Sequence, residues 1–115
     1  EVLRDLEVRR RVVIAGDMLE LGASAPAAHQ AIGRLAARAG AELIVAIGAF
    51  AGDIAQGASE AGAVRTITYS AVGELLPQLA SLVRHGDGIL VKGSRGIRLE
   101  AVTDALRNPP ASSRP

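Results

Sequence analysis

The sequence contains no cysteine and no tryptophan, and its aromatic residues are one Phe and one Tyr. The lack of cysteine excludes a disulfide scaffold and any site in which a thiolate acts as nucleophile or metal ligand. Phe50 and Tyr69 alone cannot provide a platform on which single-stranded nucleic acid stacks. An excess of one charge is also absent, because 13 basic and 12 acidic residues leave a net charge of +1. We therefore expect no nucleic-acid partner.

Long hydrophobic runs are missing as well. No apolar segment approaches the ~20 residues that a membrane-spanning helix needs, and no signal peptide opens the sequence. We expect a soluble, cytoplasmic protein without a membrane partner. With 115 residues, of which 49% are hydrophobic and 22% charged, the chain has the size and composition of one globular domain.

Several catalytic signatures are absent too. The sequence has no G-x-S-x-G elbow, no Walker A loop, no dinucleotide fingerprint and no His, Asp and Glu cluster with metal-ligand spacing. We therefore predict no catalytic residue and no metal site within this chain.

The two ends differ in composition from the middle. Residues 1–9 carry an apolar stripe, Val2, Leu3 and Leu6, that is typical of the end of a truncated helix followed by a linker. Residues 108–115 include two adjacent prolines and have no periodicity, which predicts a disordered tail. The ordered domain is thus predicted to span residues 10–107.

Between these ends, short β-rich runs alternate with segments of helical period. Strands are predicted at residues 11–15, 42–47, 64–69 and 88–91, and helical stripes at residues 28–39, 50–58, 72–83 and 97–106. The first two strand runs are continuously apolar, as expected of parallel strands covered on both faces. Pro26 is placed in a first helical turn, Ser24 and Ser70 at N-caps, and Gly40, Gly62 and Gly86 after helix ends.

This alternation predicts a doubly wound, mainly parallel α/β sheet flanked by helices, Rossmann-like and forming a single domain. We expect the strand order 3-2-1-4. In that order the first and fourth strands are neighbours, and the crevice at their carboxyl ends is where such sheets bind ligands. The loops after these two strands are therefore the candidate site.

The first loop spans residues 16–22, with the sequence GDMLELG. Asp17 follows a buried strand, where a carboxylate can accept hydrogen bonds from a ribose hydroxyl or hold a basic group. Gly16 would allow a ligand to approach the backbone closely. The alternative is that Asp17 satisfies the polar groups of its own turn.

The second loop spans residues 92–96, with the sequence KGSRG. It combines two cations, a hydroxyl and two glycines between a strand and the start of a helix, which suits a carboxylate or a phosphate. We therefore favour an anion site over a merely charged surface loop in which Ser94 caps the last helix.

Two histidines remain. His29 lies early in the helix after the first loop and could contact a ligand from the rim of the crevice, although an exposed helical histidine without a function is the alternative. His85 precedes Gly86 at a helix end and carries no functional prediction.

Both loops carry a resemblance to a known family. The stretch VVIAGDMLELG at residues 12–22, His29 seven residues later, and the stretch ILVKGSRGIRLE at residues 89–100 resemble the C-terminal domain of the Mur ligases. The resemblance covers about residues 10–106, nearly the whole ordered part of the chain.

The resemblance implies an ATP-dependent amide ligase of three domains that acts in peptidoglycan precursor synthesis. Among the family's enzymes, the Lys-Gly-Ser-Arg loop favours the one that joins D-Ala-D-Ala to UDP-MurNAc-tripeptide. ATP and Mg²⁺ would be bound mainly by a central ATPase domain in cis, over which this domain closes. The fragment alone would then hold no cofactor and show no activity.

The resemblance also implies roles for individual residues. Asp17 would contact the nucleotide. The remaining substrate-binding residues would face the incoming dipeptide and are Lys92, Gly93, Ser94 and Arg95, with His29 matching a family histidine. Two alternatives stay open: the same domain of another Mur ligase or of a folylpolyglutamate synthase-like enzyme, and a non-catalytic ligand-binding α/β module.

Overall fold

The computed structural model describes residues 10–18, 22–62, 65–84, 86–93, 101, 102 and 106. They form a four-stranded sheet of β1 (Arg10–Gly16), β2 (Leu43–Ile47), β3 (Thr66–Tyr69) and β4 (Asp87–Lys92). The strand order is β3-β2-β1-β4, and every neighbouring pair is parallel. The predicted parallel sheet and its strand order are therefore confirmed.

The two central strands are the most apolar ones. All five residues of β2 are buried, and so are the last five of β1. Val12 pairs with Leu43 and Val13 with Ile44, so apolar side chains lie side by side on each face of the sheet. A strand that is covered on both faces has to be apolar throughout, which explains why these runs do not alternate.

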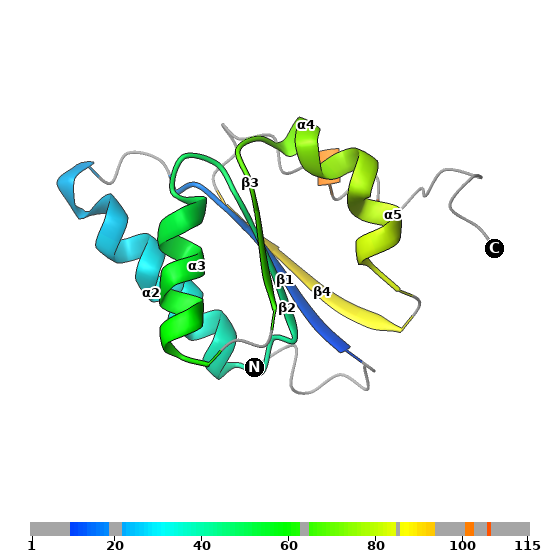
Figure 1. The fold of residues 1–115 in the computed structure, drawn as a ribbon, viewed down its shortest axis with the longest axis horizontal. Helices are drawn as coiled ribbons and strands as arrows, with labels where there is room; N and C mark the ends of the chain where they lie inside the picture. Colours follow the sequence, from blue (N-terminus) through cyan, green and yellow to red (C-terminus); the bar gives the residue numbers. More distant parts are fainter. Residues whose placement is uncertain are drawn as a thin grey trace.

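Helices cover both faces of the sheet (Figure 1). Helices α2 (Ala25–Arg38) and α3 (Ala51–Glu60) lie side by side on one face, and a short 3-10 turn, η1 (Gly22–Ser24), precedes α2. The other face packs against α4 (Val72–Leu75), η2 (Leu76–Gln78) and α5 (Leu79–Leu82). The residues that the structure describes therefore form two hydrophobic cores, one on each side of the sheet.

Two glycines allow α2 and α3 to approach closely. A Cβ on Gly33 would lie 1.9 Å from the carbonyl oxygen of Ile54, and one on Gly57 would lie 1.8 Å from that of Gln30. No side chain larger than hydrogen fits at these distances, so the helix pair depends on both glycines. Because α2 and α3 follow β1 and β2, this contact also fixes where the loops at these two strand ends meet their helices.

The segment predicted as one helix over residues 72–83 is broken into three short pieces. Pro77 lies within the middle piece, η2, which has 3-10 geometry. Proline has no N–H to donate to the preceding turn, and its ring collides with the carbonyl four residues earlier, so a regular α-helix cannot continue through it. The apolar stripe still faces the sheet, because Val72, Leu75 and Leu79 are buried.

The predicted helix ends agree with the structure in most respects. Pro26 lies in the first turn of α2, and Gly40 and Gly62 follow α2 and α3 with φ values of +92° and +87°. Ser24 occupies the N-cap position of α2, but its side chain makes no capping hydrogen bond. The N-cap of α4 is Ala71, one residue after the predicted Ser70.

Of the predicted last helix at residues 97–106, the structure describes Ala101, Val102 and Leu106, which are helical. Val102 is fully buried against the face of the sheet that α4 and α5 cover. Residues 1–9 and 108–115, predicted as linker and tail, lie outside the described residues, as does His85. The domain boundaries of 10 and 107 stay a prediction.

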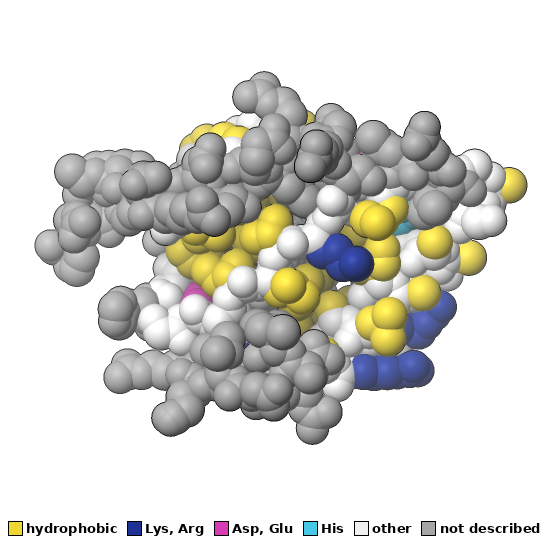
Figure 2. Space-filling model, turned by 180° about the vertical axis from the view of Figure 1, so that it is seen from behind, with side chains coloured by type: hydrophobic (Ala, Val, Ile, Leu, Met, Phe, Trp, Pro, Cys, Tyr) yellow, Lys and Arg dark blue, Asp and Glu magenta, His cyan; other side chains and the backbone are white. Residues whose placement is uncertain are grey.

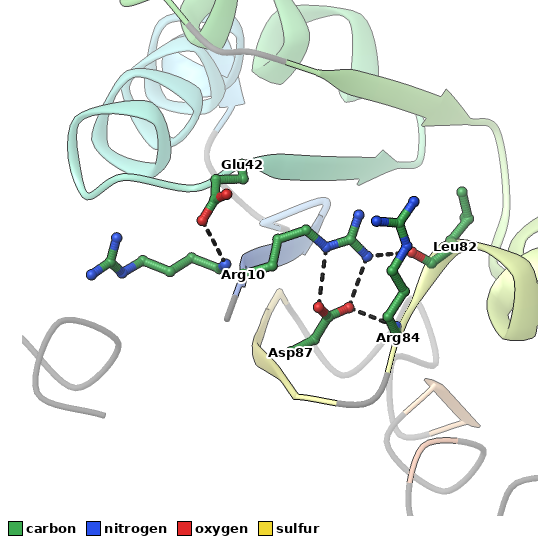
Figure 3. Close-up of polar contacts among 6 residues, drawn as sticks. Arg10, Glu42, Leu82, Arg84 and Asp87 are labelled. Atoms are coloured by element: carbon green, nitrogen blue, oxygen red, sulfur yellow. Dashed lines mark hydrogen bonds and ion pairs between the residues drawn. The ribbon is translucent and has the colours of Figure 1, made fainter. Parts of the chain in front are cut away.

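An ion pair joins β1 and β4 at the amino end of the sheet (Figure 3). Arg10 Nε donates to Asp87 Oδ1 at 3.1 Å and Nη2 donates to Oδ2 at 2.8 Å. Nη2 also donates to the carbonyl of Leu82 at 2.6 Å, and the Arg84 N–H donates to Asp87 Oδ2 at 2.7 Å. The pair thereby ties the starts of two strands to the end of α5.

This network shifts the pKa of both partners. Burial of Asp87 by itself raises its carboxyl pKa, but the hydrogen bonds from Arg10 and Arg84 outweigh that effect, and the pKa is lowered overall. The hydrogen bond to Asp87 raises the pKa of Arg10. Both shifts favour the charged forms, although the Asp87 side chain is only 2% exposed, because the hydrogen bonds outweigh the effect of burial.

Among the described residues, two large hydrophobic side chains are exposed: Leu35 on α2 at 66% and Leu90 on β4 at 42%. Leu90 pairs with Val13, so its side chain lies on the α2 and α3 face of the sheet, at the edge strand. Seen from behind, hydrophobic side chains occupy the middle of the molecule, with Lys and Arg side chains at separate places (Figure 2). No helix in the described part of the chain is long and apolar enough to cross a membrane.

Candidate functional site

The two candidate loops leave the same edge of the sheet. Strands β1 and β4 are neighbours, and Ala15 pairs with Lys92, the last residue of β4. Lys92 and Gly93 are exposed at this edge. Ser94 and Arg95 lie outside the described residues. The predicted neighbourhood of the two loops is thus confirmed for the residues that the structure describes.

Asp17 is almost buried, at 8% exposure, and its carboxylate points to the start of α3. Oδ2 accepts a hydrogen bond from the Ala49 N–H and Oδ1 accepts one from the Phe50 N–H, both at 3.0 Å. A helix leaves its first N–H groups without partners inside the helix, and a negative charge there is stabilising. Asp17 therefore accepts hydrogen bonds from the N–H groups of a turn. This turn follows β2 and is not the turn in which Asp17 itself lies.

Gly48 makes this contact possible, although its role was missed in the sequence. It has a φ of +114°, and a Cβ at this position would lie 2.5 Å from the Asp17 carboxyl carbon. Its own N–H donates to the Tyr69 carbonyl at 2.9 Å, which joins the ends of β2 and β3. A glycine directly after a buried strand was the signal that could have indicated this close approach.

A cavity of about 190 Å³ opens beside Asp17 at the carboxyl ends of β2 and β3. Its lining residues are Asp17, Ile47, Gly48, Ala49, Ser70, Ala71 and Val72. Each Asp17 oxygen carries a second lone pair beyond the one that faces α3, so the carboxylate can accept further hydrogen bonds. The cavity lies on the β2 and β3 side of Asp17, whereas the expected crevice is between β1 and β4. Ser70, which the sequence predicts only as a helix N-cap, also lines this cavity.

A second carboxylate, that of Glu74, does not line the cavity but contacts the backbone of a residue that does. Glu74 accepts a hydrogen bond from the Ser70 N–H at 2.7 Å, and this bond lowers the pKa of the Glu74 carboxyl. The bond spans one turn and fixes the backbone of Ser70, which lines the cavity. The Ser70 residue itself is exposed, so its hydroxyl is accessible from solvent.

His29 is fully buried, with 0% exposure, and is not the exposed residue that one alternative had expected. Its Nε2 lies 2.9 Å from the Met18 N–H, and its Nδ1 lies 2.6 Å from the Ala25 carbonyl. Its ring stacks on Phe50, with centroids 4.5 Å apart and planes at 17°. A direct contact with a ligand, as predicted from the sequence, would require the ring to give up one of these partners.

Within the described residues, no group of three or more His, Asp or Glu side chains could hold a metal ion. The arrangement at this edge therefore consists of a carboxylate held by backbone N–H groups, an adjacent cavity and an exposed lysine.

Comparison with known proteins identifies the domain. A family model described as Mur ligase, glutamate ligase domain, matches residues 1–95. The chain belongs to this family. The resemblance of the GDMLELG and KGSR stretches is thereby explained by common descent.

Individual relatives agree with this assignment. The chain is 37% identical to UDP-N-acetylmuramoyl-tripeptide–D-alanyl-D-alanine ligase of Mycobacterium tuberculosis, over 85% of the chain and 22% of the relative. It is 34% identical to the enzyme of that name from Escherichia coli K12, over 84% of the chain and 21% of the relative. The chain thus spans about a fifth of the length of these relatives.

Solved structures of the family have the same fold. A crystal structure of MurF from Acinetobacter baumannii superposes with a TM-score of 0.78 at 30% identity, covering 91% of this chain and 23% of that one. The MurF ligase from Thermotoga maritima in complex with ADP has a TM-score of 0.62 at 23% identity and is similar in fold, covering 83% of this chain and 21% of that one.

Proposed function

We propose that this chain is the C-terminal domain of an ATP-dependent ligase that joins D-Ala-D-Ala to the terminal carboxyl group of UDP-MurNAc-tripeptide. The relatives that carry this name are 34% and 37% identical to more than four fifths of the chain. The proposal includes a cytoplasmic location and a central ATPase domain in cis, over which this domain closes.

The observation that carries the proposal is the register of the parallel strands β1 and β4. Ala15 pairs with Lys92, so the loop with the carboxylate and the loop with the cation leave adjacent strands in the same direction. Opposite charges at one sheet edge can bind two different components of a condensation at once. Asp17 takes the nucleotide, and the loop that begins at Lys92 takes the carboxylate of the incoming dipeptide.

Asp17 has the chemistry for a contact with the ribose of a nucleotide. Its two oxygens retain acceptor capacity toward the cavity, and the hydroxyl of Ser70 can serve as a second polar group there. Hydroxyl groups of a sugar are donors that a carboxylate binds well. ATP supplies the energy for amide formation, and the central domain holds most of it together with Mg²⁺.

The second loop positions the amine component. We propose that Lys92 and Arg95 bind its carboxylate while Ser94 and the Gly93 backbone offer further hydrogen bonds. Holding the amine beside the activated carboxyl group removes entropy from the barrier, which is the main contribution that a binding domain can make to such a reaction. Closure of the domain would complete the site and exclude water.

The test is a ligation assay on the complete gene product with ATP, UDP-MurNAc-tripeptide and competing amino components. We expect D-Ala-D-Ala to be preferred, and Lys92→Ala or Arg95→Ala to raise its apparent KM about tenfold or more, as expected on loss of a charged hydrogen bond. Asp17→Asn should raise the KM for ATP and leave that for the dipeptide nearly unchanged.

Two results would contradict the proposal. A preference for another amino component would assign the chain to a different member of the family. Unchanged KM values for D-Ala-D-Ala in both cation variants would remove the second loop from the site. The isolated domain should bind no cofactor tightly and hydrolyse no ATP, which an ATPase assay measures directly.

A further inference from the structure

The contacts of His29 link it by two routes to Asp17, the residue proposed to bind the nucleotide. His29 Nε2 faces the Met18 N–H, Met18 follows Asp17 in sequence, and Asp17 accepts a hydrogen bond from the Phe50 N–H. The ring of Phe50 in turn stacks on the ring of His29. Three separate elements meet in these contacts: the loop after β1, the turn before α3 and the first turns of α2.

The polar contacts fix the state of the imidazole ring. A backbone N–H can only donate, so Nε2 must accept the bond from Met18 and carries no proton. Nδ1 then carries the proton and donates it to the Ala25 carbonyl. The ring is therefore neutral and held in one tautomer, with both nitrogens used inside the fold.

We propose that His29 is a positioning residue for the reaction, acting through Met18 and Phe50 on Asp17, and does not touch the substrate itself. The inference rests on the proposed contact between Asp17 and the nucleotide. Asp17 lies directly between the two points that His29 holds: its own chain continues into Met18, and its carboxylate is anchored at Phe50. Loss of the acceptor at Nε2 frees the Met18 N–H and with it the backbone that follows Asp17.

The geometry explains why a histidine is needed at this position. The site requires an acceptor for Met18, a donor for Ala25 and a flat ring for Phe50 on one buried side chain. A glutamine side chain would place an amide oxygen the same number of bonds from Cβ as Nε2 but would lose the ring. A phenylalanine side chain would keep a ring for stacking but would leave the partly buried Met18 N–H without its histidine partner.

The two substitutions therefore separate positioning from packing. We would introduce His29→Gln and His29→Phe into the complete gene product and measure the apparent KM for ATP, kcat and Tm. We expect His29→Phe to raise the KM for ATP about tenfold and His29→Gln to stay within about threefold of the unchanged protein, as for loss or retention of one partly buried hydrogen bond. Of the two variants, His29→Phe should have the higher Tm, because Phe packs better on Phe50.

Controls make each outcome decisive. Arg34→Gln on the same helix breaks an exposed ion pair with Glu60 and should leave the KM for ATP unchanged. If His29→Phe does not fold, His29→Asn takes its place, because it loses the acceptor at the position of Nε2 and should raise the KM in the same way.

The inference is overturned if the variant with the lower Tm has the higher KM for ATP, or if every folded His29 variant keeps the KM of the unchanged protein. Asp17→Asn, measured in parallel, separates this result from failure of the proposed function. A raised KM for Asp17→Asn with unchanged His29 variants refutes only the positioning role. An unchanged KM for Asp17→Asn with a raised KM for His29→Phe refutes the Asp17 contact, and with it the positioning of Asp17 by His29.

Discussion

The two ends of the sheet each hold a nearly buried aspartate, and they hold it in different ways. At the amino end, Asp87 faces the guanidinium of Arg10 through two hydrogen bonds. At the carboxyl end, the hydrogen bonds described for Asp17 come from the backbone N–H groups of Ala49 and Phe50. A full positive charge neutralises the first carboxylate, whereas the described hydrogen bonds of the second come from backbone dipoles.

This difference indicates where the molecule is built for stability and where for binding. The charge of Asp87 is neutralised inside the fold by Arg10, so this carboxylate is poorly suited to bind a ligand. The charge of Asp17 is held in place without being matched by a cation among the described contacts, and it borders a cavity. A carboxylate that is positioned and still electrostatically active suits a binding site.

The largest expected effect is at the amino end. Arg10→Ala leaves the buried Asp87 carboxylate without its cation, and we expect a loss of about 3 kcal/mol in the free energy of unfolding. Chemical denaturation measures this loss. The matched control is Arg34→Ala, whose partner Glu60 is half exposed and whose loss should cost no more than about 0.5 kcal/mol. Equal losses in the two variants would contradict the comparison, as would a raised KM for ATP in Arg10→Ala.

An intermediate effect is expected at the carboxyl end. Gly48→Ala places a methyl group 2.5 Å from the Asp17 carboxyl group and strains a backbone with a φ of +114°. We expect a loss of about 2 kcal/mol together with a raised KM for ATP, because Asp17 has to move. Gly52→Ala is the control: nothing lies within 4 Å of the new Cβ, and alanine should stabilise α3 by up to about 1 kcal/mol. A Gly48→Ala protein with normal stability and KM would refute the role of this glycine.

The smallest effect is a dependence on pH. Because the folded state lowers the pKa of Asp87, its ionised form contributes stability at pH values above the unfolded pKa. That contribution is lost as the pH falls through the ordinary aspartate range toward the lower folded pKa. Asp87→Asn should therefore be less stable than the unchanged protein near neutral pH, by about 1 to 2 kcal/mol. The difference should shrink in acid, as denaturation at several pH values would reveal. A difference that grows in acid would contradict this assignment.

Much of the fold could be predicted from the sequence because its signals are local. Continuous apolar runs such as residues 43–47 indicate buried parallel strands, and stripes with a period of three to four residues indicate helices on their faces. The prediction was wrong in treating residues 72–83 as one helix, although Pro77 was visible in the sequence. A proline one turn inside a helix pattern interrupts it, whatever the apolar stripe suggests.

The site was less predictable because its decisive contacts join distant residues. Asp17 was found from its place at a strand end, but its partners at residues 49 and 50 belong to another turn. His29 was found through the resemblance to the family, and the sequence alone could not show that it is buried with both nitrogens paired. Gly48 and Ser70 line the cavity because the fold brings the ends of β1, β2 and β3 together, and no sequence pattern shows this.

The sequence by itself determined the parallel sheet flanked by helices, since hydrophobic periodicity and right-handed crossovers leave few other arrangements. The strand order 3-2-1-4, which places the two loops at one edge, was an expectation that the structure confirmed. Only the tertiary structure decided which way the Asp17 carboxylate points and what His29 holds. The contact of His29 with Met18 joins residues 11 positions apart, and that of Asp17 with Phe50 joins residues 33 positions apart. Their geometry depends on how α2 and α3 pack through Gly33 and Gly57, which no local pattern encodes.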